Sequence, residues 1–441
     1  MSGSHAAPSR FAVLTTTLRR PNIGRSIART AGFNLASATA AGLGGIVLAR
    51  AVGPTVRGEY AAITAWFGLA LIVGGMGQSA ALCFYVAHDP SHGCDYVATS
   101  RAMMLVTGSL ALTAGLLLAP MLAHGNPTVT TGYRIAFGAA ILAYVGVSYT
   151  SALQARDMRR WNVVRVIQPL LSCAAMVTLW RLRILTLNNV LVLLPVTMLL
   201  QLIWAYVCCR GVGLAPGRAT LSLARPLAAY GAAQIAALAP ATLNAQLDQL
   251  ILSQIVPSAD LGRYAIAVSL SLLPLPLVAA IGNVAFPKLA AQRRVTASTH
   301  KVQKLAVLGG GAIAAAALVP LAAVAYWMVP LVFGRGYQGA VPLLWILTPG
   351  TIFLACSQVA GDLLRGRKRP MLVAWSQGLA ALFTVALLLM LLPLVGVYGA
   401  PIASTIAYGV ALAAMLRCLW RLPTDEGGDE EFADTGRAVV P

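Results

Sequence analysis

Amide and carboxylate side chains inside long apolar runs are the residues best placed to do chemistry in this chain. The run at 226–256 contains Gln234, Asn244 and Asp248, which fall within about 80° of one another around an α-helix. Pro240 lies between them and is expected to kink that helix. Buried polar groups of this kind either pair across helices or face a wet cavity. The sequence therefore leaves two interpretations open: interhelical hydrogen bonds, or a cavity wall in which Asp248 is an ion-coupling carboxylate.

Two arginines within apolar runs could bind an anion. Arg29 lies about one turn inside the run at 26–49, from where its side chain could equally extend to the headgroups. Arg165 has a similar depth in a later run, and Gln168 follows three residues later on the same helical face. Guanidinium groups suit phosphate oxygens because they offer paired charged donors. Asn34 belongs to a stripe of small residues that is more typical of close helix packing.

Other chemistries are not supported by the sequence. His88 and His92 provide at most two metal ligands, and the seven cysteines show neither a CxxC pair nor regular spacing. The glycines at 309–311 lack the Lys-Ser/Thr of a phosphate loop. The chain has no nucleotide-binding motif and no nucleophile–base–acid set, so we expect no metal, no cofactor and no enzymatic activity.

The composition requires a membrane environment for the helices that carry these residues. Of 441 residues, 58% are hydrophobic and 10% are charged, whereas soluble domains carry about 25% charged residues. The mean hydropathy is +0.77. The net charge of +19 lies in short clusters between apolar runs, which argues against nucleic acid as a partner. Membrane lipids are the expected surroundings.

Apolar runs of membrane-spanning length recur along the whole sequence. They predict an all-α polytopic membrane protein with about twelve transmembrane helices. The expected helices are at 26–49, 60–87, 101–123, 132–153, 161–180, 184–209, 226–256, 262–287, 305–329, 341–364, 371–395 and 398–420.

Basic clusters predict the orientation of these helices. Most of the 32 Lys and Arg residues fall on alternate loops, and such loops are cytoplasmic in multi-pass proteins. Both termini then lie in the cytoplasm and the protein lies in the inner membrane. The first 25 residues form a basic cytoplasmic segment, and nearly half of the 13 acidic residues follow Leu422, so the tail at 421–441 is expected to be solvated and disordered.

Two halves of the chain resemble each other. A Gly-x-Tyr at 58–60, after the first helix, matches another at 262–264, after the seventh. Basic clusters before Gln168 and Gln377 also match, which adds Gln377 to the candidate cavity residues. Both repeats start on the same side, so they are parallel repeats, with a cavity expected between two lobes. The predicted lobes are 26–210, with helices 1–6, and 226–420, with helices 7–12, joined by a cytoplasmic loop at 211–225.

Five segments resemble the polysaccharide (Wzx-type) flippases of the multidrug/oligosaccharidyl-lipid/polysaccharide (MOP) exporter superfamily. They occur in the family's order at 47–62 (VLARAVGPTVRGEYAA), 247–267 (LDQLILSQIVPSADLGRYAIA), 285–290 (AFPKLA), 332–347 (VFGRGYQGAVPLLWIL) and 391–405 (LLPLVGVYGAPIAST). The resemblance implies a two-lobed flippase that moves a polyprenyl-pyrophosphate-linked oligosaccharide from the cytoplasmic to the outer leaflet by alternating access. It also implies a polysaccharide polymerase and glycosyltransferases as partners.

Two other functions remain open at this stage. An ion-coupled small-molecule or drug antiporter of the same superfamily would need lumenal carboxylates for organic cations, whereas a pyrophosphate calls for lumenal Arg or Lys. A non-transporting scaffold of a polysaccharide synthesis complex would need neither.

The orientation yields a first prediction. With the native cysteines removed, a Ser298→Cys variant should resist labelling by a membrane-impermeant thiol reagent added to intact cells, because the basic loop around it is cytoplasmic. Labelling after the cells are opened is the control. Efficient labelling of intact cells would reverse the predicted topology.

Overall fold

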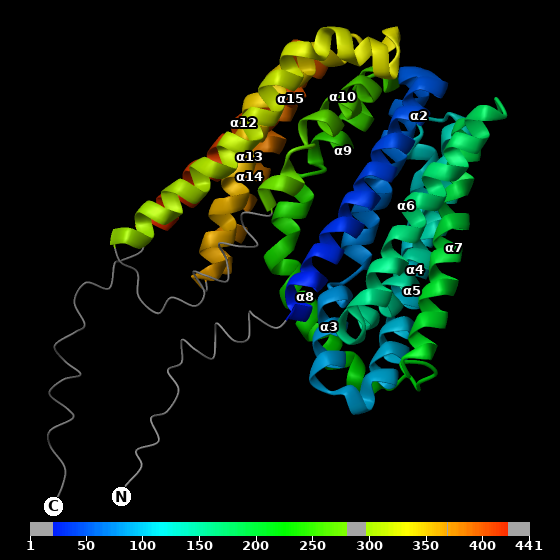
Figure 1. Ribbon diagram of the computed structural model, residues 1–441. Coiled ribbons are helices and arrows are strands. Elements are labelled where there is room, and N and C mark those ends of the chain that lie inside the picture. The colour runs from blue at the N-terminus through cyan, green and yellow to red at the C-terminus, as the bar shows by residue number, and fades with distance from the viewer. Residues whose placement is uncertain (1–20, 280–296, 368, 422–441) are drawn as a thin grey trace, which may run out of the picture. The chain divides into compact units, whose positions relative to one another are not determined.

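The computed structural model describes residues 21–279, 297–367 and 369–421, and all regular structure within these ranges is helical (Figure 1). The chain begins with α2 (Pro21–Gly74), α3 (Gln78–His88), η1 (Pro90–His92), α4 (Gly93–Leu122), α5 (Pro127–Arg156), α6 (Met158–Arg181) and α7 (Leu187–Gly211). It continues with α8 (Leu221–Asn244), α9 (Leu247–Ile255), α10 (Ser258–Ser271), α12 (Ala297–Phe333), η2 (Arg335–Tyr337), α13 (Ala340–Gly366), α14 (Pro370–Val395), η3 (Gly396–Tyr398) and α15 (Gly399–Trp420).

The described helices confirm the predicted number of crossings. Nine stretches are long and apolar enough to span a membrane. Two of them, Arg29–Gly74 and Pro370–Trp420, have 46 and 51 residues, and each is divided by a glycine with positive φ, Gly53 at 74° and Gly396 at 60°. Since one crossing needs about 20 residues, each of these two stretches crosses twice. With these two counted twice, the nine stretches account for eleven crossings, and the twelfth predicted helix, at 226–256, corresponds to the interrupted α8–α9 pair.

Three breaks in the helices differ from the predicted boundaries, and α4 and α12 each begin eight residues earlier than predicted. The break expected between residues 49 and 60 is confined to one residue of α2, Gly53, which has a positive φ. The helix resumes directly after it because the ring of Pro54 fixes a φ suited to the first residue of a helix. A second break, at 75–77, interrupts the expected helix 60–87, where Met76 and Gly77 have positive φ. The expected helix 226–256 is divided after Asn244 into α8 and α9, beyond the expected kink at Pro240.

The helices form two compact units by their contacts. The first comprises Met1–Ala51 and Val73–Ala232, and the second comprises Val52–Ile72 and Ala233–Pro441. This grouping assigns the second half of α2 to the C-terminal unit, whereas the sequence assigned it to the N-terminal lobe. The lobe boundaries themselves stay a prediction. Residues 1–20, 280–296, 368 and 422–441 lie outside the described residues, and with them most of the predicted basic N-terminal segment, the segment AFPKLA at 285–290 and the predicted acidic tail.

In the N-terminal unit, α5 packs against α4 and α7, and α6 packs against α7, so these helices lie side by side (Figure 1). Their core includes Leu82, Leu153 and Val164, all fully buried. In the C-terminal unit, α13 packs against α10, α12 and α15, and α14 packs against α15. Leu363 and Leu364 of α13 are fully buried in its core.

In each unit an arginine side chain donates a hydrogen bond to a backbone carbonyl near the C-terminus of a helix. In the N-terminal unit, Arg160 Nη1 donates to the Cys208 carbonyl oxygen at 3.3 Å, near the end of α7. In the C-terminal unit, Arg367 Nη1 donates to the Leu419 carbonyl oxygen at 3.4 Å, near the end of α15. The last carbonyls of a helix have no partner within it, and a cation satisfies both their hydrogen bonding and the helix dipole. A contact of the same kind thus occurs in both units, although the sequence repeat pairs Arg160 with Arg369 and not with Arg367.

A crossing of two helices within the C-terminal unit depends on glycine. A Cβ atom at Gly58 of α2 would overlap the backbone of Ser258, and one at Gly262 of α10 would overlap the backbone of Pro54. These two glycines are matched by the sequence repeat, and here the two matched segments pack directly on each other. Backbones approach this closely only where side chains are absent.

This crossing predicts a large effect of a single methyl group. Gly58→Ala and Gly262→Ala should each destabilise the protein by about 1–3 kcal/mol, because the added carbon forces two backbones apart. Gly45→Ala is the matched control, since a Cβ at this helical position has no neighbour within 4 Å. Thermal unfolding of the purified protein in detergent measures the difference, and equal melting temperatures for all three variants would contradict the close approach.

Candidate functional site in the C-terminal unit

A cavity of about 320 Å³ lies among the helices of the C-terminal unit. Residues of α8, α9, α10, α13, α14 and α15 line it. Three of the predicted site residues, Asn244, Asp248 and Gln377, belong to this lining. Gln377 is 129 or more positions from the other two in the sequence. Gln358, Asp362, Arg365 and Tyr408 also line the cavity.

Asp248 is held in place by the start of α9. It lies in the first turn of that helix, where backbone N–H groups have no helical partner and the dipole favours a negative charge. Its Oδ1 accepts a hydrogen bond from the Gln249 N–H at 2.7 Å, and its Oδ2 accepts one from the Tyr264 hydroxyl. Both side chains are deeply buried, with Asp248 4% exposed and Tyr264 0% exposed. The carboxylate is therefore already bound by two donors of its own unit.

Asn244 ends α8 and joins that helix to α14. Its Oδ1 accepts a hydrogen bond from the Thr384 hydroxyl at 2.8 Å, and its Nδ2 lies 3.5 Å from Gln377 Oε1, a long contact. Gln377 and Thr384 are seven residues apart and thus share one face of α14. The break after Asn244 separates this amide from the carboxylate at the start of α9, so the two groups predicted to share a helical face contact different helices.

The C-terminal half of α13 completes the polar lining. Arg365 Nη1 donates to Asp362 Oδ1 at 2.8 Å, which is the pairing expected for an i,i+3 pair on a helix. Gln358 lies one turn earlier, and its Oε1 is buried without a hydrogen-bond partner among the described residues. The cavity thus presents one ion pair, one hydrogen-bonded carboxylate and several amides and hydroxyls.

The remaining predicted residues do not line this cavity. Gln234 of α8 is half-buried. In the N-terminal unit, Arg29, Asn34 and Arg165 are exposed and Gln168 is half-buried.

The two arginines nevertheless lie on helices of the N-terminal unit that contact each other. The guanidinium of Arg165 stacks on the ring of Trp161, 4.2 Å from its centroid, a cation–π contact. Asn162 Nδ2 donates to the Thr30 hydroxyl at 2.9 Å, which joins α6 to the start of α2. Thr30 directly follows Arg29, and Asn162 is three residues before Arg165.

Sequence reasoning missed Gln358, Tyr264 and Tyr408. One signal was available for α13, because Thr351, Gln358 and Arg365 recur every seven residues and so form a polar stripe on one helical face. Nothing in the sequence marks Tyr264 as the partner of Asp248, since the pairing depends on how α9 and α10 pack.

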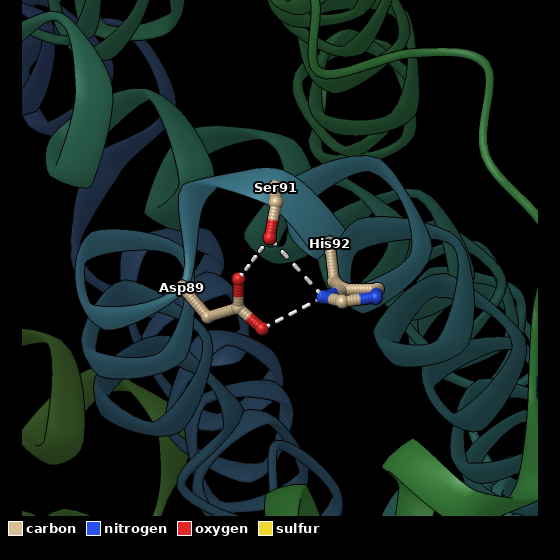
Figure 2. A network of polar contacts seen from close by, with 3 residues as sticks. All are labelled: Asp89, Ser91 and His92. Atoms are coloured by element: carbon tan, nitrogen blue, oxygen red, sulfur yellow. Dashed lines mark hydrogen bonds and ion pairs between the residues drawn. The ribbon is translucent and has the colours of Figure 1, made fainter.

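A second polar cluster, Asp89, Ser91 and His92, lies at the turn between α3 and α4 and does not form a catalytic relay (Figure 2). His92 Nδ1 lies 2.8 Å from Asp89 Oδ2 and 3.3 Å from Ser91 Oγ. A Ser–His–Asp relay needs the serine and the aspartate at opposite ring nitrogens, whereas both meet the same one here. Hydrogen bonds from Ser91 and then His92 lower the pKa of the Asp89 carboxyl. The cluster fixes an exposed turn.

The fold is that of the MOP-superfamily transporters. A multidrug resistance MATE family transporter of that superfamily in an inward-facing conformation has a TM-score of 0.74 at 13% identity, with 87% of this chain and 94% of that chain covered. The lipid II flippase MurJ in an inward closed conformation has a TM-score of 0.69 at 12% identity, covering 89% and 88%. The MATE multidrug transporter DinF-BH has a TM-score of 0.63 at 15% identity, covering 91% and 96%.

Residues 23–293 match the family described as "Polysaccharide biosynthesis protein". This match covers more than half of the chain, so the protein belongs to the polysaccharide biosynthesis protein family. A comparison with curated protein sequences finds no match. Family and fold together confirm the predicted resemblance to MOP-superfamily polysaccharide flippases, and these are multi-pass membrane proteins of transporter and flippase type.

The burial of Asp248 predicts a cost for removing its tyrosine donor. Tyr264→Phe should destabilise the protein by about 1–3 kcal/mol, because a buried charged acceptor loses a hydrogen bond. Tyr133→Phe is the matched control, since Tyr133 is equally buried and its hydroxyl has no partner among the described residues. That variant should be neutral or slightly stabilising. Thermal melts in detergent compare the two, and an equal effect of both changes would show that the Tyr264 hydrogen bond contributes nothing.

Proposed function

We propose that this protein moves a polyprenyl-pyrophosphate-linked oligosaccharide from the cytoplasmic to the outer leaflet of the inner membrane by alternating access. Membership of the polysaccharide biosynthesis protein family supports a saccharide as the cargo. Both termini are then cytoplasmic, as the basic loops predict, and the polymerase and glycosyltransferases of the same pathway are the expected partners.

The observation that carries this proposal is the polar cavity of the C-terminal unit, in which each charged side chain is ion-paired or hydrogen-bonded. Both of its carboxylates are engaged: Asp362 pairs with Arg365, and Asp248 accepts hydrogen bonds from Tyr264 and Gln249. The other polar groups that line it are amides and hydroxyls. Amides and hydroxyls donate and accept hydrogen bonds without charge, which suits the hydroxyl groups of a glycan better than an organic cation.

The anionic end of such a substrate needs cationic donors. Arg29 and Arg165 are exposed in the N-terminal unit, on two helices joined by the Thr30–Asn162 hydrogen bond. A guanidinium offers a planar pair of donors that matches phosphate oxygens. We assign the pyrophosphate to these two arginines, with Gln168 and Asn34 as neighbours in the same unit.

A drug antiporter is the nearest competing function, since two of the compared structures are multidrug transporters. An organic cation would be bound by a carboxylate, and of the two carboxylates in the described lining Asp362 is already ion-paired with Arg365, while Asp248 accepts hydrogen bonds from Tyr264 and Gln249. A non-transporting scaffold would translocate nothing, so transport in reconstituted vesicles separates it from both alternatives.

Purified protein in vesicles should flip a lipid-linked oligosaccharide, and Arg165→Ala should slow this flipping roughly tenfold or more. A charge-assisted hydrogen bond is typically worth about 1.5–3 kcal/mol, and about 1.4 kcal/mol is a factor of ten. Arg165→Lys should retain part of the rate, because the charge remains while the planar fork is lost.

Arg181→Ala is the matched control for this experiment. Arg181 is exposed at the other end of α6 and also lies over a tryptophan, Trp180. Its removal should leave flipping unchanged. Equal rates for Arg165→Ala, Arg181→Ala and the parent would remove Arg165 from the proposed anion site.

Asp248→Asn tests a separate part of the proposal. If this carboxylate couples transport to an ion gradient, the variant should flip substrate at a rate that no longer responds to the gradient. If Asp248 only joins α9 to α10, this near-isosteric change should leave the gradient dependence intact. The measurement is flipping in vesicles with and without an imposed proton or sodium gradient.

A further inference from the structure

We propose that the cavity of the C-terminal unit is a subsite that binds one neutral sugar ring through the side-chain amides of Gln358 and Gln377. This inference rests on the proposed function, because it assigns one part of the glycan to one part of the protein. It places saccharide recognition within a single unit and separates it from the arginines assigned to the pyrophosphate.

The size of the cavity fits a single ring. Its volume of about 320 Å³ is at the lower end of the range of small-molecule pockets, about 300–1,000 Å³.

The amides provide the hydrogen bonds that such a ring needs. Gln358 makes no hydrogen bond to another described residue, and its Oε1 is buried. Gln377 makes one long contact, to Asn244, which leaves its Nε2 without a described partner. Buried polar atoms are almost always paired, so the unpaired Oε1 of Gln358 and the weakly engaged amide of Gln377 leave hydrogen-bonding capacity for a polar ligand in this cavity. Rotation about the last side-chain torsion can present either the oxygen or the nitrogen to that ligand.

The charged groups of the lining already have partners within the C-terminal unit. Arg365 is occupied by Asp362, and Asp248 is occupied by Tyr264. The ion pair uses Arg365 Nη1 and Asp362 Oδ1, so the other guanidinium nitrogens can donate and the other carboxylate oxygen can accept a hydrogen bond. This suits a ligand whose polar groups both donate and accept. A hydroxyl group does so, whereas a metal ion or an ammonium group does not.

The apolar part of the lining accounts for the rest of a sugar surface. Leu275, Leu347, Leu354 and Met415 line the same cavity. A pyranose ring has carbon-bound hydrogens on its faces and hydroxyl groups around its edge. Apolar side chains can cover such faces while polar groups converge on the edge, which is the usual organisation of a small-molecule site.

The test combines flipping with direct binding. Gln358→Leu and Gln377→Leu should each slow flipping of the lipid-linked oligosaccharide about threefold to tenfold, the loss of one to a few neutral hydrogen bonds. The double variant should slow it further. Gln234→Leu is the matched control, because Gln234 is a half-buried glutamine of the same unit that does not line the cavity, and it should flip at the parent rate. Gln358→Met repeats the test with an unbranched side chain should the leucine variant fold poorly.

Binding is measured with free monosaccharides as probes, namely neutral hexoses, N-acetylhexosamines and the corresponding uronic acids. A neutral sugar should raise the melting temperature of the parent and of Gln234→Leu by mass action, and the uronic acids should not. The double variant should lose this shift. Uptake of the same free sugar into vesicles distinguishes a free-sugar site from one that serves the lipid-linked substrate, for which no uptake is expected.

The outcomes separate the two proposals. A parent that does not flip the lipid-linked substrate would overturn the proposed function, whereas the sugar-dependent melting shift would still report on the subsite. A parent that flips normally, together with a double variant that flips at the same rate, would overturn the subsite and leave the flippase assignment in place.

Discussion

The hydrocarbon core of a bilayer provides no hydrogen-bond partners, so a polar group of this chain that lies within the membrane is costly unless it finds a partner in the protein, in water or in a ligand. Helices satisfy the backbone by themselves, and this is why the described regular structure is entirely helical. Side-chain polar groups have no such automatic solution. Their placement is governed by breaks in helices, because a break exposes backbone donors and acceptors at positions where a side chain can use them.

The α8–α9 break illustrates this dependence. It provides a new helix N-terminus inside the C-terminal unit, and Asp248 occupies the first turn of α9, where unpaired N–H groups favour a carboxylate. The last residue before the break, Asn244, extends to α14 and bonds Thr384. An uninterrupted helix would leave both groups on one stripe. The interruption lets them contact different neighbours and open a cavity between them.

The two units share one structural contact, an arginine bonded to a carbonyl near a helix end. They differ in the polar residues that we assign to the substrate. Arg160 donates to a carbonyl near the end of α7 and Arg367 to one near the end of α15, whereas Gly58 and Gly262 meet at a single crossing within the C-terminal unit. The polar cavity that we assign to a sugar ring is lined by residues of the C-terminal unit, while the exposed arginines assigned to the pyrophosphate belong to the N-terminal unit.

The sequence by itself determined the class of the protein, because the length and the recurrence of apolar runs follow directly from the thickness of a bilayer. The sequence also identified polar residues whose placement inside a membrane costs free energy. Three of these, Asn244, Asp248 and Gln377, line one cavity. Only the tertiary structure decided their partners. Tyr264 and Thr384 lie in apolar runs, and nothing in the sequence distinguishes them from other residues there. They become partners of Asp248 and Asn244 only because α10 packs beside α9 and α14 beside α8, since a hydrogen bond depends on distances between helices. Periodicity along one helix places a residue on a face, and packing alone decides what that face meets.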